Sequence, residues 1–350
     1  MAQFNTLNIK SISKETDKAV IISFVVPSYL KADYAFIAGQ YITLKTTINE
    51  EEVRRDYSLC ASPKSGNLEV AVKMVENGVF SSYANSQLEA GDTIDVSTPQ
   101  GRFKFEPNAA KARHIAAFAA GSGITPILSI AKSVLEEEPK STFVLVFGNK
   151  NVADTMFLKE ILDLHHNYKE RFHIQLVYSQ DSKEDAISGR IEESTVDLII
   201  KNKFKDITFD AFYLCGPEGM INTVKTTLLA NQIHSETIHF ELFKVAKNEV
   251  NKDISSNGET KITVIVDDEE ETFTMSQKNT ILEAALEKDL DAPYSCQGGI
   301  CSSCIARIKE GSAEMKKNSI LTDAEIADGL IITCQAHPTS ATLIVDYDDV

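Results

Sequence analysis

The chain of 350 residues contains no tryptophan, only six cysteines and no long apolar segment. No apolar run approaches the ~18 residues that a membrane-spanning helix needs, and residues 1–20 lack the apolar core of a signal peptide. These absences predict a cytoplasmic protein that does not insert into a membrane. The composition is 43% hydrophobic and 25% charged, which is ordinary for a globular protein. At about 150 residues per domain, the length predicts two or three domains.

Basic residues are scarce relative to acidic ones. The chain has 35 lysines and arginines against 51 aspartates and glutamates, which gives a formal net charge of −16. This charge argues against nucleic acid or an anionic membrane surface as a partner. Residues 260–350 hold 17 acidic and 7 basic residues, so this last part of the chain suits transient docking on a basic protein surface.

Four of the six cysteines have the spacing C-x4-C-x2-C, with the fourth after 29 intervening residues. They are Cys296, Cys301, Cys304 and Cys334. This spacing holds a plant-type [2Fe–2S] cluster on four thiolates. Gly298 and Gly299 suit such a loop, because the backbone must pass close to the inorganic sulfides. Structural zinc also takes four cysteines but favours two C-x2-C pairs, and a disulfide framework is not typical of a chain of this length without an export signal.

Residues 1–107 contain short segments that alternate or run apolar, separated by breaks rich in Gly, Asn, Pro and Ser. The segments are 19–26, 39–47, 54–62, 68–75 and 92–99. Because no long helical pattern interrupts them, they predict a small antiparallel β-barrel.

Residues 108–243 show a different rhythm, in which strand and helix patterns alternate. The expected strands are 114–120, 141–149, 172–179, 210–217 and 236–243, and the expected helices are 121–138, 154–168, 191–200 and 219–232. This alternation predicts an α/β domain with a parallel, doubly wound sheet. Residues 244–259 are polar and predict a flexible linker. Residues 260–350 then form a separate α+β domain around the cysteine loop.

Several stretches in the first two domains have the residue types of nucleotide sites. Arg55 and Tyr57 share one face of a strand and together can contact a phosphate and an aromatic ring. The other interpretation is that they are exposed side chains that bind no ligand. Residues 77–83 put a glycine and two hydroxyls at a helix start, which suits a phosphate or a plain N-cap.

The α/β region has two more such stretches. Residues 121–126 follow a strand and open a helix, so they can accept a pyrophosphate, although the third glycine of the G-x-G-x-x-G fingerprint is missing. Cys215 stands at the carboxyl edge of the sheet, where ligands of open α/β sheets bind; a buried small hydrophobe is the alternative.

Taken together, these motifs resemble those of the ferredoxin–NADP reductase superfamily, in the same order and over nearly the whole chain. Arg55-Asp56-Tyr57-Ser58 is similar to its R-x-Y-[ST] flavin motif, and Gly78-Val79-Phe80-Ser81 to its G-x-x-S motif. Gly121-Ser122-Gly123-Ile124-Thr125-Pro126 is similar to its G-x-G-[IV]-[TA]-P turn, and Cys215-Gly216-Pro217 to its C-G-P turn. With a plant-type ferredoxin domain of the β-grasp fold at its end, the chain resembles the reductase components of multicomponent oxygenases.

The resemblance implies three cofactors, namely FAD, a [2Fe–2S] cluster and NADPH or NADH. It assigns to the flavin Arg55, Tyr57, Ser58, Gly78, Val79, Phe80, Ser81 and Ser82. It assigns to the coenzyme Gly121, Gly123, Thr125, Pro126, Cys215, Gly216 and Pro217, and it lets Phe243 shield the flavin ring. The catalytic residues that it implies are Ser58, Cys215 and Glu241.

The choice of coenzyme and flavin stays open at this point. Members that prefer NADPH often carry Ser-Arg where this chain has Ser179-Gln180-Asp181. Arg190 and Lys150 can still supply a positive charge, and the resemblance favours NADPH over NADH. The glycine-serine stretch at Gly78 favours FAD, while a related group with the same domain order uses FMN.

The expected function is that of an electron-transfer reductase. A hydride passes from NAD(P)H to FAD, and single electrons pass through the [2Fe–2S] cluster to a separate oxygenase. Three alternatives remain. The acceptor can be another oxygenase, hydroxylase or desaturase; the chain can be a non-enzymatic ferredoxin-like electron carrier; or the cluster can serve a redox sensor, which the lack of a basic segment disfavours.

Overall fold

The structure is a computed structural model that describes residues 3–243 and 258–350. Its described residues form two compact units, Phe4–Phe243 and the part of the chain from residue 258 onward. The predicted linker 244–259 falls outside the described residues except for its last two positions. No helix in the described part of the chain is long and apolar enough to cross a membrane.

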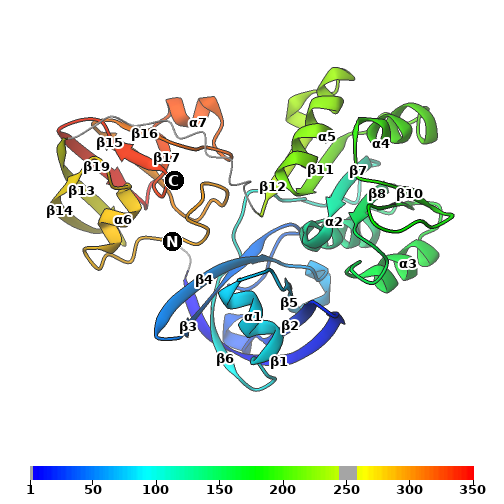
Figure 1. Ribbon diagram of the computed structural model, residues 1–350, viewed down its shortest axis with the longest axis horizontal. Coiled ribbons are helices and arrows are strands. Elements are labelled where there is room, and N and C mark those ends of the chain that lie inside the picture. The colour runs from blue at the N-terminus through cyan, green and yellow to red at the C-terminus, as the bar shows by residue number, and fades with distance from the viewer. Residues whose placement is uncertain (1–2, 244–257) are drawn as a thin grey trace. The chain divides into compact units, whose positions relative to one another are not determined.

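The first half of the unit Phe4–Phe243 is an antiparallel barrel, as predicted (Figure 1). Its sheet order is β4-β3-β6-β1-β2-β5. The strands are β1 (Phe4–Thr16), β2 (Ala19–Val25), β3 (Tyr41–Ile48), β4 (Glu51–Ser58), β5 (Leu68–Lys73) and β6 (Thr93–Ser97). An antiparallel bridge between Leu59 and Val70 joins the two edges and closes the sheet. Helix α1 (Val79–Ser86) packs Phe80 and Ala84 into the barrel core.

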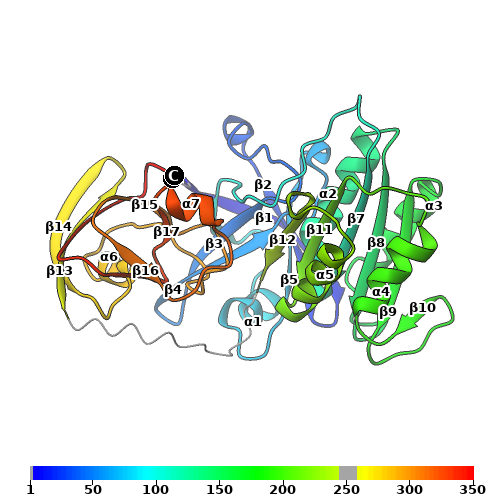
Figure 2. The same cartoon turned by 90° about the horizontal axis from the view of Figure 1, so that it is seen from above.

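The second half is a parallel sheet covered by helices on both faces (Figure 2). Its order is β10-β9-β8-β7-β11-β12, and every pair in it is parallel. The strands are β7 (His114–Ala120), β8 (Thr142–Asn149), β9 (Phe172–Tyr178), β10 (Ala186–Ser188), β11 (Ala211–Gly216) and β12 (Ile238–Leu242). The helices are α2 (Ile124–Glu137), α3 (Leu158–Asn167), α4 (Glu193–Asp197) and α5 (Glu218–Ala230).

The central strand β7 explains why this sheet is covered twice. Its residues Ile115, Ala117 and Ala119 pack with α2 and α3, whereas Ala116 and Phe118 pack with α4 and α5. A strand that buries both faces reads as a continuous apolar run, which is what its sequence shows. The helix predicted near residues 191–200 is present: α4 ends at Asp197, and a wider helical turn follows from Leu198 to Lys203.

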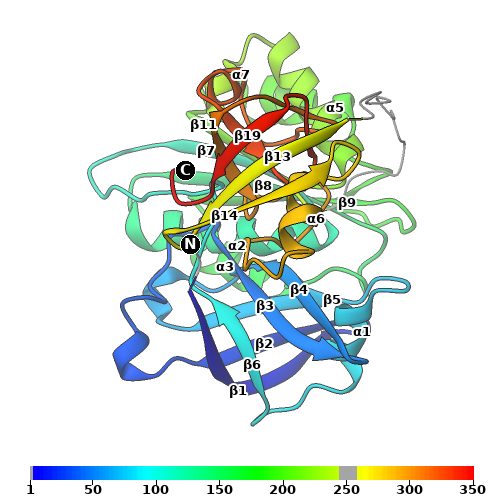
Figure 3. The ribbon, with the colours of Figure 1, turned by 90° about the vertical axis from the view of Figure 1, so that its left-hand side faces the viewer.

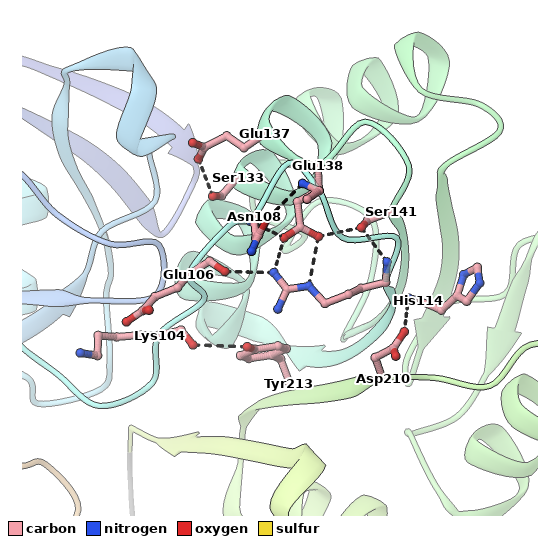
Figure 4. Close-up of polar contacts among 12 residues, drawn as sticks. Lys104, Glu106, Asn108, His114, Ser133, Glu137, Glu138, Ser141, Asp210 and Tyr213 are labelled. Atoms are coloured by element: carbon pink, nitrogen blue, oxygen red, sulfur yellow. Dashed lines mark hydrogen bonds and ion pairs between the residues drawn. The ribbon is translucent and has the colours of Figure 1, made fainter.

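A buried ion pair fastens the barrel's exit segment to the α/β domain (Figure 4). Arg113 donates from Nε to Glu138 Oε2 at 3.1 Å and from Nη2 to Glu138 Oε1. Glu138 also accepts hydrogen bonds from Asn108 N at 2.7 Å and from Ser141 Oγ at 2.6 Å. Because a fully buried carboxylate is costly without partners, this cluster holds the segment between the two domains in one geometry.

Helix α2 makes a second set of polar contacts with the barrel. Ser129 Oγ donates to Ala61 O at 2.7 Å, and Lys132 Nζ donates to Cys60 O at 3.0 Å. Lys132 also pairs with Glu160 of α3 at 2.7 Å. The loop that α2 holds directly follows β4 and Leu59, so the strand with the Arg-x-Tyr-Ser motif is fixed against the helix that opens at the glycine turn.

The unit from residue 258 onward is a small α+β domain, as predicted (Figure 3). Its main sheet has the order β14-β13-β19-β15-β17, in which only β13 and β19 are parallel. The strands are β13 (Glu259–Val266), β14 (Glu269–Ser276), β15 (Ile305–Glu310), β17 (Leu330–Ile332) and β19 (Thr342–Asp346), with β16 (Ala313–Met315) and β18 (Ala336–Pro338) as a separate pair. Helix α6 (Ile281–Leu286) packs on the sheet, and α7 (Asp323–Ala327) precedes β17. Both helices begin with a capping box.

Candidate functional site

Ser58, Cys215 and Glu241 come together from three different strands. Ser58 ends β4 in the barrel, and its Oγ donates to Glu241 Oε2 at 3.3 Å. Cys215 of β11 lies beside Glu241 in the parallel register of β11 and β12. The structure therefore joins a barrel strand and the last two strands of the α/β sheet at one point. The roles of these residues stay predictions.

The surroundings of this group keep Glu241 protonated. Burial raises the pKa of Glu241 to about 8, against the opposing effect of the Ser58 hydrogen bond, and the nearby Asp56 carboxylate raises it further. At neutral pH the carboxyl group therefore carries a proton. Burial, and to a lesser extent the neighbouring Glu241, also raise the pKa of Cys215, whose side chain is fully buried, so Cys215 is a thiol.

The two flavin motifs of the sequence meet in the barrel. The Tyr57 ring on β4 packs on the Phe80 ring of α1, with centroids 5.4 Å apart and planes inclined at 37°. Arg55, two residues before Tyr57, is exposed. Burial raises the pKa of Tyr57 well above its ordinary value, so its hydroxyl stays neutral. The tyrosine of the first motif and the helix of the second are thus neighbours here.

An open pocket lies at the start of α1. It is lined by Ile48, Asn49, Asn77, Gly78, Val79, Ser82, Tyr83 and Gln87. A Cβ atom at Gly78 would lie 2.4 Å from Val75 Cγ2, so the turn requires glycine there. The backbone N–H groups at the start of a helix attract anions, and this pocket therefore has the donors that a flavin pyrophosphate needs.

Two residues of the same motif are directed inward instead. Phe80 is 1% exposed and Ser81 is 6% exposed. Ser81 Oγ accepts a hydrogen bond from Val75 N at 3.2 Å and so shapes the turn before the helix. Of the predicted phosphate contacts in this stretch, Gly78, Val79 and Ser82 line the pocket, whereas Phe80 and Ser81 do not.

The glycine turn after β7 contacts the end of β11 directly. Gly121 has φ 56°, the left-handed region that favours glycine. A Cβ atom at Gly123 would lie 2.1 Å from the carbonyl oxygen of Cys215, so only glycine allows the two chain segments to approach. Thr125 Oγ1 donates to Ser122 O at 3.0 Å, and Thr125 and Pro126 are both buried beneath the turn.

The adjoining turn after β11 also opens a helix. Gly216 ends β11 and Pro217 is the N-cap of α5. Strands β7 and β11 are neighbours although they are not consecutive, so the chain order reverses between them. Ligands of open α/β sheets bind at such a point, outside the carboxyl ends of the strands. Phe243, the last residue described in this unit, packs against the same core cluster as Cys215.

The four patterned cysteines lie in two pairs. Cys296 and Cys301 are hydrogen-bonded to each other, as are Cys304 and Cys334, and the Cys296 charge acts on both members of the second pair. The Cys301 hydrogen bond, followed by backbone N–H groups that include Gly298, lowers the pKa of Cys296 to about 5 against burial. Within residues 3–243 and 258–350, no three His, Cys, Asp or Glu side chains already surround one metal position. As a donor set, four neighbouring cysteines, one of them readily ionised, fit an iron–sulfur cluster.

Gln335 joins the two cysteine segments, and the sequence reasoning missed it. Its Nε2 donates to Gln297 O at 3.1 Å and to Cys334 O at 2.9 Å, and lies 3.9 Å from Cys334 Sγ. Gly299 has φ 71°, and a Cβ atom there would lie 2.8 Å from Gln335 Cγ. At Gly298 a Cβ atom would meet only ordinary contact, so the neighbouring protein atoms require glycine at 299 and not at 298.

Three family models match the chain, one for each expected cofactor. They describe an oxidoreductase FAD-binding domain over residues 6–105, an oxidoreductase NAD-binding domain over residues 118–226 and a 2Fe-2S iron-sulfur cluster binding domain over residues 264–339. The expected cofactor set is therefore confirmed, and the zinc and disulfide alternatives are set aside.

Curated relatives match over the full length. The chain is 36% identical to one of the subunits of the 1,2-phenylacetyl-CoA epoxidase of Escherichia coli (strain K12), with 99% of each chain covered. It is 30% identical to the ferredoxin reductase component of 3-ketosteroid-9-alpha-monooxygenase from Rhodococcus rhodochrous, with 97% of this chain and 96% of the relative covered.

Solved structures share the fold. Phthalate dioxygenase reductase matches with a TM-score of 0.60 at 24% identity, with 98% of each chain covered. An intact type IV self-sufficient cytochrome P450 monooxygenase matches with a TM-score of 0.72 at 21% identity, over 98% of this chain and 41% of that one. These likenesses confirm the predicted sequence of barrel, parallel sheet and α+β domain.

Proposed function

The chain belongs to the ferredoxin–NADP reductase superfamily, among the oxygenase reductases with a C-terminal [2Fe–2S] domain, and from this membership we propose which residues act and which acceptor is served. The chain is an oxidoreductase and a reductase component of a multicomponent oxygenase. When bound, FAD takes a hydride from NAD(P)H and releases single electrons through the [2Fe–2S] cluster to the oxygenase component.

The flavin is held by the barrel strand β4 and by helix α1. Arg55 binds a flavin phosphate, and Tyr57, backed by Phe80, lies against the flavin. The N–H groups at Gly78 and Val79 and the Ser82 hydroxyl bind the pyrophosphate. The packing of Tyr57 on Phe80 and the pocket at the start of α1 support this assignment.

The coenzyme binds at the edge of the parallel sheet between β7 and β11. Its pyrophosphate lies on the turn Gly121–Pro126, and its nicotinamide faces Cys215-Gly216-Pro217, with Phe243 next to the flavin ring. The close approach of Gly123 to Cys215 supports a single site built from both turns. Lys150 and Arg190 are exposed on this domain and supply positive charge for a 2′-phosphate, which favours NADPH over NADH.

Ser58, Cys215 and Glu241 form the catalytic group. Glu241 holds a proton near neutral pH, and the Ser58 hydroxyl lies within hydrogen-bond reach of its carboxyl group. Ser58 therefore can pass a proton between Glu241 and a ligand atom beside β4, while the buried Cys215 thiol excludes water from the nicotinamide face. The contact between Ser58 and Glu241 is the observation that carries this assignment.

The cluster is held by the four thiolates of the C-terminal unit. They are Cys296, Cys301, Cys304 and Cys334. The acidic excess of residues 260–350 suits an acceptor with a basic docking surface. The domain limits that we propose are 1–107, 108–243 and 260–350, joined across 244–259.

The acceptor that we propose is phenylacetyl-CoA epoxygenase, an enzyme of phenylacetate catabolism. The motifs resemble the reductase subunit of this system in particular, and the 36% identity over 99% of both chains is the observation that carries the proposal. A steroid 9α-monooxygenase is the second candidate, since that reductase component is 30% identical over nearly the whole chain.

The test is an anaerobic titration followed by reconstitution. The purified protein should show flavin and iron–sulfur absorption that bleaches on addition of NADPH or NADH, and the faster coenzyme decides the preference. It should then support epoxidation of phenylacetyl-CoA when mixed with the epoxygenase component, but not turnover by the steroid oxygenase. A colourless protein would overturn the reductase assignment, and turnover with the steroid oxygenase alone would overturn the choice of acceptor.

A further inference from the structure

Asn149, the last residue of β8, has a buried side-chain amide without a hydrogen-bond partner. Neither Nδ2 nor Oδ1 has a partner among the described residues, and both atoms are buried. The main chain at this position is satisfied, because Asn149 O accepts from Ser179 N at 3.0 Å. A primary amide offers two donors and two acceptor lone pairs, and leaving them unmet in a buried place lowers stability. Such a group is explained when a ligand supplies the missing partners.

Asn149 lies at the edge of the sheet where the proposed coenzyme site is. It stands at the carboxyl end of its strand, where ligands of parallel α/β sheets bind. In the register of β7 and β8, Gly148 lies beside Ala120, the residue before the glycine turn. On the opposite side of β7, strand β11 brings Cys215 to the same edge. Because the strands that end at this edge have the order β8-β7-β11, the edge presents Asn149, the turn that begins at Gly121, and Cys215 in that spatial order.

We propose that the Asn149 amide binds the adenylate half of NAD(P)H through its ribose and phosphate oxygens. The inference rests on the proposed coenzyme site. If the pyrophosphate lies on the turn over β7 and the nicotinamide lies beside Cys215 on one side, the other half of the dinucleotide extends over β8 on the other side. There Nδ2 donates to a phosphate or ribose oxygen, and Oδ1 accepts from a ribose hydroxyl.

The residues that follow β8 and β9 also fit an adenylate site at this edge of the sheet. Gln180 N donates to Lys150 O at 2.8 Å, so the strand ladder continues past both strand ends and keeps Lys150 next to the Ser179-Gln180-Asp181 segment. Lys150 is exposed and supplies charge, whereas Asn149 is neutral and supplies directional hydrogen bonds. Asn149 therefore positions the adenylate, and its loss should affect all adenylate ligands that the protein binds.

The test uses the full chain with its cofactors bound and the substitution Asn149→Leu, which removes the amide at similar volume. Isothermal titration measures Kd for NADP+ or NAD+, whichever the wild type binds more tightly, and for the matching 2′,5′-ADP or 5′-ADP. We expect both Kd values to rise about tenfold, as the loss of one or two hydrogen bonds to a ligand predicts. The Tm of the coenzyme-free variant should be unchanged or higher, because the unmet polar atoms are gone.

Asn231→Leu is the matched control, because that amide is satisfied. Asn231 Nδ2 donates to Asp197 Oδ1 at 3.2 Å and to Thr227 O at 2.8 Å, at the end of α5. This variant should show the opposite pattern, with a lower Tm and unchanged Kd values. Asn149→Asp is the second variant, in case the leucine chain does not fold. Its carboxylate should weaken adenylate binding at least as much, because it repels phosphate.

Each outcome decides one of the two proposals. Wild-type affinity of the folded Asn149 variants for the ADP ligand would overturn the assignment of Asn149 while leaving the coenzyme site intact. The same is true if Asn231→Leu weakens binding equally. A wild-type protein that binds neither dinucleotide nor ADP ligand would instead overturn the coenzyme site itself, and with it the role of Asn149.

Discussion

The two units of the chain differ in where their charged side chains lie. In Phe4–Phe243 charged side chains are buried where the barrel meets the parallel sheet: Glu138 is fully buried with Arg113, and Lys132 is only 12% exposed. From residue 258 onward, ion pairs such as that of Arg307 with Asp328 lie at the surface. Arg113 and Lys132 also donate hydrogen bonds to the barrel carbonyls of Glu106 and Cys60, so the buried charges of the first unit connect its two domains.

The second unit is organised around sulfur. Residues 287–304, between α6 and β15, form neither helix nor strand, and three of the four patterned cysteines lie in or at the end of this segment. A long irregular segment in a compact domain is typically functional. Since metal binding supplies folding free energy, we expect the second unit to depend on its cluster and the first unit to keep its shape without one. The predictions that follow test this contrast.

The largest expected effect is that of Cys301→Ser, which removes one cluster thiolate. Electron transfer to a one-electron acceptor such as cytochrome c should be abolished, because no path from the flavin to the acceptor remains. Reduction of the flavin by NAD(P)H should continue, since it takes place in the unit Phe4–Phe243. Stopped-flow absorbance under anaerobic conditions measures both steps. Cys60→Ala, at a buried cysteine outside the cluster pattern, should keep both activities. Loss of flavin reduction in Cys301→Ser would break the contrast between the units.

The next effect is on the stability of the first unit. Glu138→Gln leaves the Arg113 guanidinium partly buried without its counter-charge, which should cost about 3 kcal/mol of the free energy of unfolding. Burial alone would raise the pKa of Glu138, but the hydrogen bonds from Arg113 and Ser141 outweigh it and lower the pKa. The ion pair therefore stabilises the fold above the ordinary glutamate pKa, and this stabilisation is lost as pH falls through the lowered value.

Urea unfolding at several pH values, followed by flavin fluorescence for the first unit and by cluster absorbance for the second, measures this effect. The wild type should lose stability below about pH 4.5, the ordinary glutamate value, whereas Glu138→Gln should lack that part of the pH dependence. Asp328→Asn, which breaks an ion pair in the second unit at a residue 72% exposed, is the matched control and should change stability within experimental error. Equal losses in both variants would show that the two units do not differ in this respect.

A third prediction concerns proton handling at Glu241. The rate of flavin reduction by NAD(P)H should change with pH around the Glu241 pKa of about 8. Glu241→Gln should remove this transition and slow the reaction about tenfold to a hundredfold, as expected for loss of a positioned proton carrier. Because burial raises the pKa of Glu241, the contribution of this one group to the stability of the first unit is fully present below the ordinary glutamate pKa and is lost as pH rises through about 8.

The Glu241 experiment needs a control on the same strand. His239→Asn changes an exposed side chain of β12 two residues before Glu241 and should leave the pH transition in place. An unchanged pH profile in Glu241→Gln would remove this residue from the catalytic group. The cysteine-bearing unit should show no corresponding transition in its cluster absorbance.

Sequence patterns predicted the architecture where burial leaves a simple periodic signal. The continuous apolar run of β7 reflects a strand buried on both faces, and the alternation along β13 reflects a strand with one buried face. The longest strand, β1, was not predicted. Only Leu7 and Ile9 are fully buried among its residues Phe4–Thr16, and two irregularities interrupt its register with β2. Such a strand forms because neighbouring strands pair with it, and its own sequence lacks the periodic pattern of apolar residues that would predict it.

The candidate site was predictable in a similarly uneven way. The order of the motifs indicated the flavin and coenzyme regions. The resemblance named Ser58 and Glu241 as catalytic residues, but the contact between them joins residues 183 positions apart and was not predicted. The Ser81 side chain points inward because of its position on the first turn of α1. The G-x-x-S motif does not indicate this direction. Asn149, Lys132 and Gln335 act through partners that are distant in sequence or outside the chain, so no local pattern could single them out.

The smallest expected effect comes from Gln335, which ties the cysteine loop to the strand end that carries Cys334. Gln335→Leu removes the hydrogen bond to Gln297 O, so the loop should open more often and release iron to a chelator about tenfold faster, in line with other groups that support metal ligands. Gln277→Leu is the matched control, because its Nε2 donates to Thr260 Oγ1 at 3.1 Å elsewhere in the same unit. If only Gln335→Leu accelerates release while urea unfolding of Phe4–Phe243 stays unchanged, the second unit depends on its metal loop in a way that the first does not. Equal iron release from both glutamine variants would instead show that release depends on the general stability of the second unit and not on the Gln335 hydrogen bond.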